Sequence, residues 1–140
     1  MGAPQKAAKD EMMAQTIYKV LTAEQLAAVE AGGLMQAPVD LADGYVHFST
    51  SRQVQETLTK WFHGQTGCAL VAVDGDDFGP DLKWEISRGG DWFPHVYTEV
   101  REHHVRAIWP LDEFDAAGAP IAPDEVTRAP EPASKPVRPS

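Results

Sequence analysis

Three short segments carry side chains that could take part in acid–base chemistry. Each alternates apolar and polar residues in the way that a strand with one buried face does. The segments are GYVHFST, LKWEIS and FPHVYTE. Their polar faces present His47, Glu85 and His95. Two imidazoles and a carboxylate around one cleft could donate, accept or hold a proton, so these three are predicted to be the catalytic residues.

Further polar side chains on the same faces would extend the wall of such a cleft. Ser49 lies two residues after His47, and Tyr97 lies two residues after His95. Ser49 and Thr50 also stand directly before a stretch with helical periodicity. They can cap that helix, and its free amide groups can bind a phosphate or carboxylate beside His47. We predict that Ser49, Thr50 and Tyr97 contribute to ligand binding.

Each of these residues also has a structural explanation. A histidine on a half-buried strand commonly makes one hydrogen bond without any catalytic role. Glu85 can form a surface ion pair with Lys83, two residues earlier on the same face, which would contribute about 0–1 kcal/mol. A serine and a threonine before a helix are explained by capping alone. The sequence leaves the structural and the functional explanation open.

Motifs for metal, thiol and phosphate-loop chemistry are missing from the sequence. His103 and His104 are adjacent and would point to opposite faces of a strand, and neither an HExxH motif nor a cysteine pair occurs. Cys68 lies in the apolar run CALVAV, where a thiolate is disfavoured. The sequence has no glycine-rich phosphate-binding motif. We therefore predict no metal site.

Periodicity along the chain predicts the elements that hold these faces. Thr22 and Gln25 form a capping-box pair at the start of the helical stretch TAEQLAAVEAG. A second helix is predicted from an apolar stripe that consists of Val54, Leu58, Trp61 and Phe62. Strands are predicted over residues 17–21, 44–50, 68–73, 82–87, 93–100 and 105–111, with the apolar 68–73 strand central. This order predicts an α+β fold, with two helices packed on a mainly antiparallel sheet.

Composition limits the class of protein. The 140 residues are 43% hydrophobic and 24% charged, with a formal net charge of -9. An acidic chain is a poor match for duplex nucleic acid, because its phosphates attract Lys and Arg. No apolar run approaches the ~20 residues that a membrane-spanning helix needs, and no secretory signal is present. We expect a cytoplasmic protein without a membrane or duplex partner; the sequence leaves its oligomeric state open.

The chain divides by composition into three segments. Residues 1–15 are small, polar and charged, and are predicted to form a flexible arm. Residues 16–114 contain all the tryptophans and histidines, and are predicted to form a single globular domain. Residues 115–140 alternate proline with small and charged residues and contain no aromatic residue. Such a segment buries too little apolar surface to offset its ordering entropy, so a disordered tail is predicted.

Four motifs, in their order and spacing, resemble an uncharacterised bacterial family known as domain of unknown function 952. The motifs are IYKVLT, GYVHFSTSRQV, LKWE and WFPHVY, and together they span about residues 16–111. The resemblance implies an ADP-ribosyltransferase-like fold, closest to the RNA 2′-phosphotransferase branch. Such a fold has a split, mainly antiparallel sheet, with a cleft that holds an ADP-ribose-like ligand. NAD is accordingly a candidate cofactor.

The resemblance also implies ligand-binding positions within these motifs. Tyr18 and Lys19 occupy the first ligand-binding strand, and His47 lines the pocket that holds nicotinamide in such folds. Gln53 and Phe93 belong to the matching motifs and are expected to contact the ligand. Arg88 is the candidate for an arginine of the phosphotransferase set.

Two kinds of function follow from these observations. The first is a transferase, or a degenerate relative of one, that acts on a nucleotide-like small molecule. The alternative is a non-catalytic module that binds a metabolite in the same pocket, or a protein-interaction module that uses its acidic surface and Pro-rich tail.

Overall fold

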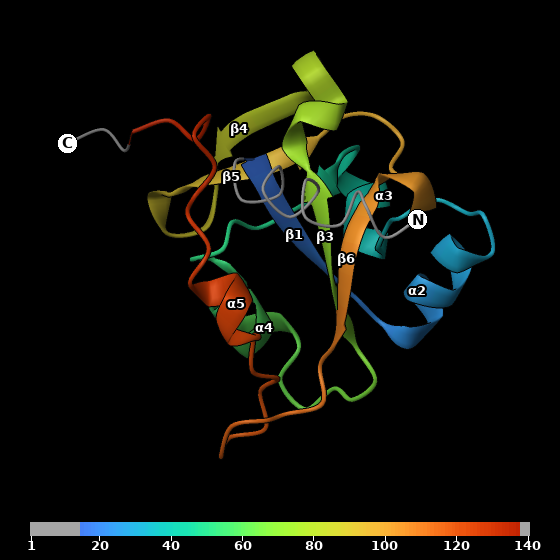
Figure 1. Cartoon of the computed structure of the whole chain (residues 1–140), viewed down its shortest axis with the longest axis vertical. Coiled ribbons are helices and arrows are strands. Elements are labelled where there is room, and N and C mark those ends of the chain that lie inside the picture. Colours follow the sequence, from blue (N-terminus) through green and yellow to red (C-terminus); the bar gives the residue numbers. More distant parts are fainter. Residues whose placement is uncertain (1–14, 138–140) are drawn as a thin grey trace, which may run out of the picture.

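Two three-stranded antiparallel sheets form the centre of the molecule in the computed structural model, which describes residues 15–137 (Figure 1). The first sheet has the strand order β1 (Thr16–Leu21), β3 (Ala69–Asp74) and β6 (Val105–Pro110). The second has the order β2 (Val46–His47), β5 (Trp92–Val96) and β4 (Leu82–Ile86). The α+β prediction with mainly antiparallel pairing is therefore confirmed.

The helices are more numerous than the two that the sequence predicts. The described part of the chain has four α-helices: α2 (Ala23–Glu30), α3 (Pro38–Asp43), α4 (Val54–Trp61) and α5 (Asp124–Thr127). It also has three 3-10 segments: η1 (Gly75–Asp81), η2 (Arg88–Gly90) and η3 (Glu102–His104). No helix among these is long and apolar enough to cross a membrane.

Strand β3 is the centre of the first sheet, as its continuous apolar sequence predicts. It pairs with β1 on one side and β6 on the other, and all of its residues are buried. One face of the sheet packs into a cluster that includes Ile17, Val71 and Val29 of α2. The other face packs with α4 and α5 in a second cluster that includes Leu70 and Leu58. Coverage on both faces explains why β3 has no polar alternation.

The segment from β2 to Ser49 joins the two sheets. Val46 and His47 pair with β5, and the Phe48 N–H donates to the Pro94 carbonyl at 3.1 Å. One residue later, Ser49 and Tyr18 exchange two backbone hydrogen bonds of 2.8 Å, so the same segment now pairs with β1. The chain thus passes from one sheet to the other within four residues and places β1 beside the histidine strand.

The start of helix α2 confirms its predicted capping box. The Gln25 N–H donates to the Thr22 hydroxyl, and the Thr22 N–H donates to the Gln25 side chain. Helix α4 differs from its prediction at both ends. Gln53, rather than Ser49 or Thr50, precedes its first turn, and no side chain caps it. Trp61, placed in the apolar stripe by the sequence, is 63% exposed because it lies at the end of the helix.

Helix α3 occupies a segment for which the sequence predicts neither a helix nor a strand. Pro38 stands in its first turn, where the missing N–H costs nothing. The Asp40 carboxylate accepts the Ala37 N–H at 2.7 Å and so satisfies a free amide at the helix start. Gly44 ends the helix with a φ of 85°, a conformation that favours glycine. Local signals for α3 were present, but six residues are too few to show helical periodicity.

Residues 115–137 are ordered against the rest of the molecule, in contrast to the predicted disorder. Ala119, Ala122 and Val126 are buried, and the Ala122 N–H donates to the Gln55 side chain of α4 at 2.8 Å. Figure 1 shows α5 beside α4. The segment needs no core of its own, because it adds small apolar side chains to the cluster on α4. The predicted N-terminal arm lies almost entirely outside the described residues.

The apolar cluster between α4 and the first sheet gives a direct test of this packing. Leu58 of α4 is fully buried, whereas Leu41 of α3 is 68% exposed. We expect Leu58→Ala to lower the free energy of unfolding by about 2–5 kcal/mol. The matched Leu41→Ala should change it by no more than about 0.5 kcal/mol. Urea denaturation followed by circular dichroism measures both, and equal costs would contradict the described packing.

Candidate ligand-binding site

A cavity of about 560 Å³ is lined by residues of both sheets and of helices α3 and α4. This size is typical of pockets that hold small molecules. Its polar lining consists of Tyr18, Lys19, His47, Ser49, Thr57, Ser87 and His95. Its apolar lining consists of Val20, Ala37, Val39, Phe48, Trp61, Phe62 and Phe93. Aromatic walls with a few polar groups suit a ligand that has a ring and some hydrogen-bonding atoms.

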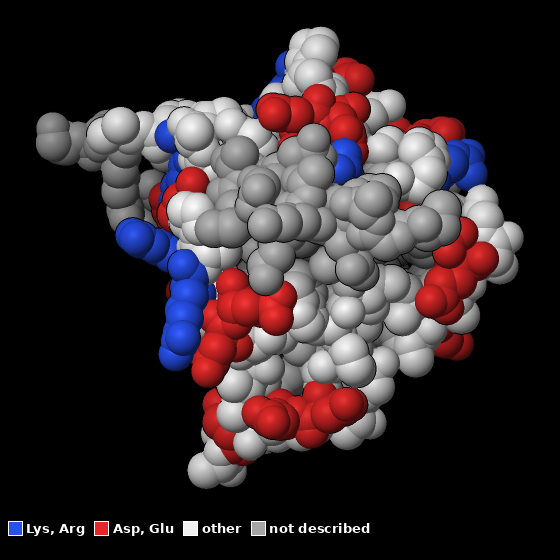
Figure 2. Space-filling view, viewed as in Figure 1, with Lys and Arg blue, Asp and Glu red and all other residues white. Residues whose placement is uncertain are grey.

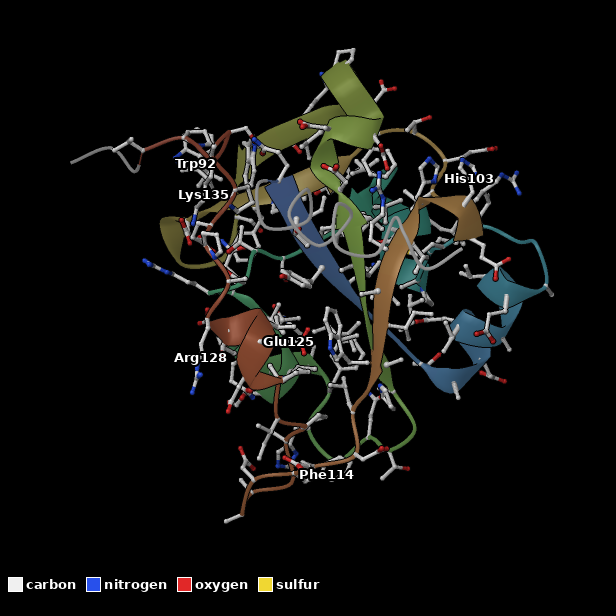
Figure 3. All side chains as sticks on the ribbon, viewed as in Figure 1. Trp92, His103, Phe114, Glu125, Arg128 and Lys135 are labelled. Atoms are coloured by element: carbon white, nitrogen blue, oxygen red, sulfur yellow. The ribbon has the colours of Figure 1, made fainter. Side chains whose placement is uncertain are left out.

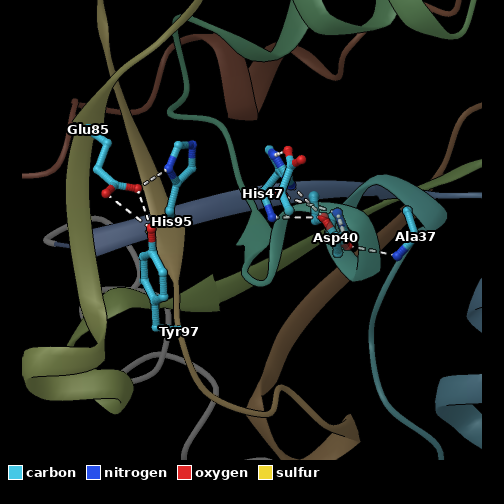
Figure 4. Close-up of polar contacts among 8 residues, drawn as sticks. Ala37, Asp40, His47, Glu85, His95 and Tyr97 are labelled. Carbon is cyan, nitrogen blue, oxygen red and sulfur yellow. Dashed lines mark hydrogen bonds and ion pairs between the residues drawn. The ribbon is translucent and has the colours of Figure 1, made fainter.

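The carboxylate of Asp40 organises one wall of this cavity (Figure 4). One of its oxygens forms an ion pair with the Lys19 ammonium at 2.9 Å and accepts a hydrogen bond from the Ala37 N–H at 2.7 Å. The other accepts the His47 backbone N–H at 3.0 Å and the ring Nδ1–H at 2.6 Å. Lys19 also donates to the His47 carbonyl at 3.0 Å. One buried carboxylate therefore connects α3, β1 and β2.

The negative charge of Asp40 is paired with the positive charge of Lys19 in this network. Burial alone would raise the pKa of Asp40, but hydrogen bonds from His47, Lys19 and Ala37 outweigh it and hold the pKa below its ordinary value. Burial lowers the pKa of Lys19, and the Asp40 carboxylate opposes that shift. A buried ion pair with several hydrogen bonds is costly to break from either side. The Lys19–Asp40 pair should therefore hold β1 and α3 in a fixed relation.

Both ring nitrogens of His47 face carboxylates. Nδ1 lies 2.6 Å from Asp40, and Nε2 lies 2.9 Å from Asp43. Both ring nitrogens of His47 are therefore occupied by carboxylates of α3, which leaves neither of them directed at a ligand.

The ring of His95 is held differently. Its Nδ1 lies 2.6 Å from the Glu85 carboxylate, which also accepts from the Tyr97 hydroxyl at 2.8 Å. Nδ1 therefore carries the proton, and Figure 4 shows the other ring nitrogen pointing away from Glu85. Within residues 15–137, no hydrogen bond to His95 Nε2 is present. Among the described residues that line the cavity, it is the imidazole nitrogen without a protein partner.

The protonation of this group follows from burial. Only 4% of the His95 side chain is exposed, and this burial lowers its pKa, although the Glu85 hydrogen bond raises it in part. The hydrogen bond from His95 keeps the pKa of Glu85 below its ordinary value, so Glu85 remains a carboxylate. The hydrogen bond to Glu85 raises the pKa of Tyr97 to about 12, so its hydroxyl remains a donor. His95 is thus a neutral imidazole near neutral pH.

Tyr45 closes the other side of the histidine pair. Its ring stacks on His95 at 4.3 Å between centroids, and lies 4.5 Å from His47 and 5.0 Å from Tyr97. His47 of β2 and His95 of β5 are direct cross-strand partners, and Tyr45 directly precedes β2 while Tyr97 directly follows β5. Aromatic packing of this kind fixes ring orientation as well as burying surface.

The residues predicted from the sequence divide into three groups. Those in the cavity lining are Tyr18, Lys19, His47, Ser49, Phe93 and His95. Glu85 and Tyr97 stand behind His95 and contact it or each other, but they do not line the cavity. Thr50 and Gln53 do not line it either. The predicted role of Arg88 concerns a side chain that lies outside the described part of the structure. The Gln53 side chain accepts from the Thr50 N–H and donates to Asp91, which is a structural role.

Several lining or supporting residues escape the sequence argument. Asp40 lies in the unpredicted helix α3, and Thr57, Trp61 and Phe62 lie on α4. The Asp40 signal was its place two residues after Pro38, where an acidic residue commonly starts a helix. Trp61 and Phe62 carried an apolar signal that pointed to the core. Among residues 15–137, no group of three His, Cys, Asp or Glu side chains is placed to hold a metal ion.

Residues 20–108 match the model of a protein family described as Protein of unknown function (DUF952), and the chain belongs to this family. The chain is similar in fold and sequence to protein CC0527 from Caulobacter crescentus, whose crystal structure has been solved and whose sequence is 41% identical. The TM-score is 0.74, over 80% of this chain and 98% of that chain. The solution NMR structure of CC0527 is 43% identical, with a TM-score of 0.66 over 75% and 90% of the two chains. Comparison with curated proteins gives no match.

The titration of His95 tests the arrangement of this wall. Glu85 raises the pKa of His95 against the effect of burial, so Glu85→Gln should move the His95 midpoint to lower pH. Imidazole ¹⁵N NMR measures the midpoint. Because the folded pKa lies below the unfolded value of about 6.5, the stability that neutral His95 contributes is complete above that pH. It is lost as the pH falls through the folded pKa.

The control for this titration is Glu99→Gln. Glu99 is an exposed partner of Arg101 and makes no contact with His95 among its described interactions. Its removal should leave the midpoint in place. An unchanged or higher His95 midpoint in Glu85→Gln would mean that Glu85 does not hold the ring.

Proposed function

We propose that the cavity binds a nucleotide-like small molecule of the ADP-ribose class, and that His95 accepts a proton during a transfer reaction. The observation that carries the proposal is the unpaired Nε2 of His95 in the cavity wall, on a ring whose Nδ1 is fixed by Glu85. A buried, neutral imidazole oriented by a carboxylate is suited to general-base chemistry.

The shape of the site supports a ligand with a planar ring. Phe48, Phe93 and Trp61 bring aromatic surface to the cavity from three separate elements. Lys19 uses two of its three donors on Asp40 and His47, so one N–H is available for an anionic or carbonyl oxygen. Over residues 15–137, the backbone pairing that joins the two sheets runs through the segment from Val46 to Ser49. That arrangement supports the split sheet of an ADP-ribosyltransferase-like fold.

Roles within the proposed reaction follow from the contacts of each residue. With an NAD-like ligand, a hydroxyl or water would attack the ribose C1′, the bond from C1′ to nicotinamide would break, and nicotinamide would leave as a neutral molecule. His95 would take the proton of the attacking group, and Glu85 would stabilise the imidazolium that forms. Tyr97 would hold Glu85 in place. His47 would shape the wall, because carboxylates engage both of its ring nitrogens. Its backbone carbonyl would help to position Lys19.

A non-catalytic binding protein is the second candidate. None of the described residues that line the cavity carries a carboxylate, since Glu85 stands behind His95. A site without a carboxylate can bind a ligand while lacking a group to stabilise positive charge on a reacting sugar. We expect no duplex nucleic acid as partner for either candidate, because the net charge of the chain is -9 and Figure 2 shows several separate groups of acidic side chains on the face in view.

Ligand titration tests the proposal. We expect ADP-ribose or NAD to raise the melting temperature of the protein, because a ligand at 100 times its Kd stabilises by ~2.7 kcal/mol. His95→Gln should abolish turnover, assayed by chromatography of the nucleotide products, while weakening binding by no more than about 10-fold. His63→Gln is the control, since His63 is exposed and lies outside the cavity.

The two candidates give different results in this experiment. Binding with turnover that His95→Gln removes supports the transferase. Binding without turnover in either protein supports the non-catalytic module. No stabilisation at millimolar ADP-ribose, NAD or AMP would overturn the nucleotide proposal.

A further inference from the structure

We infer that residues 129–135 form a strap that fixes the separation of two walls of the cavity, with Glu131 and Lys135 as its positioning residues. This inference rests on the proposed function, because it assigns the strap to the same ligand site. The segment lies beyond residue 108, where the match to the family model ends. In Figure 1 it runs from α5 up to β4 and β5.

One end of the strap is bound to the loop before α4. The Ser51 hydroxyl donates to the Ala129 carbonyl at 2.8 Å and to the Glu131 carboxylate at 3.0 Å. The backbone N–H of Arg52 donates to the same carboxylate oxygen at 3.0 Å. Ser51 is buried, so the two contacts of its hydroxyl are partly shielded from water. This end therefore fixes the start of α4, the helix that supplies Thr57, Trp61 and Phe62 to the cavity.

The other end is bound to the hairpin of β4 and β5. The Lys135 ammonium lies 3.3 Å from Asp91, directly before β5. The Trp84 indole N–H of β4 donates to the Ser134 hydroxyl at 3.2 Å. Figure 3 shows Lys135 beside Trp92 at this hairpin. This end therefore fixes the strand that supplies Phe93 and His95 to the cavity.

An ion pair within the strap connects its two ends. Lys135 also binds Glu131 at 2.9 Å, and the Gln53 side chain donates to Asp91 at 2.9 Å. A network of polar contacts therefore joins the start of α4 to the start of β5 through the strap. Its members are Ser51, Glu131, Lys135, Asp91 and Gln53. Burial would raise the pKa values of Glu131 and Asp91, but their hydrogen bonds outweigh it and keep both carboxyls ionised.

The strap also acts on a residue of the cavity itself. Burial, with the nearby charges of Glu125 and Glu131, raises the pKa of Tyr18 to about 12. Tyr18 lines the cavity and pairs with Ser49 at the junction of the two sheets. A wall held at one separation loses less entropy when a ligand binds, which increases affinity. The strap thus matters for the ligand as well as for the fold.

The test uses Lys135→Met in the full-length protein, with Glu131→Gln as a second variant. Arg128→Met is the matched control, because Arg128 is exposed and Figure 3 shows it directed outward. Hydrogen exchange is measured for amides of residues 50–53 and 91–95, and for β3 as the reference for global unfolding. We expect Lys135→Met to increase exchange about 10-fold in both segments, without change in β3.

Ligand affinity is the second measurement. Calorimetry with ADP-ribose should show a Kd raised ~3- to 10-fold in Lys135→Met and Glu131→Gln, and unchanged in Arg128→Met. If the wild-type protein binds no ADP-ribose, the proposed function fails, and the exchange data still decide the strap. Faster exchange in only one segment, or equally faster exchange in β3, would overturn the inference, as would unchanged affinity in a protein that binds.

Discussion

The carboxylate of Asp40 accepts hydrogen bonds from Lys19, Ala37 and both the backbone and the ring of His47. Burying a carboxylate without partners would cost several kcal/mol, which is a large fraction of the free energy of unfolding of a small domain. These donors offset that cost, and they come from three different elements. The position of β1 relative to β2, and hence the wall of the cavity between the sheets, depends on this one group.

The two histidines show how the surroundings assign different roles to the same side chain. His47 and His95 are cross-strand partners with rings 5.3 Å apart, and Tyr45 packs on both. His47 is bound by carboxylates at both nitrogens and is 29% exposed, so it is part of the scaffold. His95 is bound at one nitrogen and nearly buried, so its other nitrogen is available to a ligand. The contacts therefore assign a structural role to His47 and favour a role for His95 as a neutral base.

The C-terminal segment adds a further constraint to the same cavity. The family model matches residues 20–108, which include β2 to β5 and parts of β1 and β6, whereas α5 and the strap lie outside that match. Through Glu131 and Lys135, this segment contacts the loop before α4 and the start of β5. The cavity is therefore held from within by Asp40 and from outside by the strap.

Strand alternation was enough to predict which faces carry His47, Glu85 and His95, because period-two patterning is a local property. The position of Asp40 could not be predicted from periodicity, because it lies in a helix of only six residues. Order in residues 115–137 was also beyond reach. It depends on contacts such as Ser51 with Glu131, which are 80 residues apart, and composition reports nothing about such partners. The division of roles between the two histidines likewise required the positions of Asp43 and Glu85.

A double-mutant cycle on Lys19 and Asp40 tests most directly whether this buried pair sets the relation of the two sheets. Lys19→Met and Asp40→Asn should each lower the free energy of unfolding by about 3–5 kcal/mol, because each leaves a buried charge without its partner. The double variant has neither charge. We predict that its loss falls short of the summed single losses by about 2 kcal/mol or more, measured by urea denaturation. Losses that add to within about 0.5 kcal/mol would show that the two groups act independently and would contradict this account.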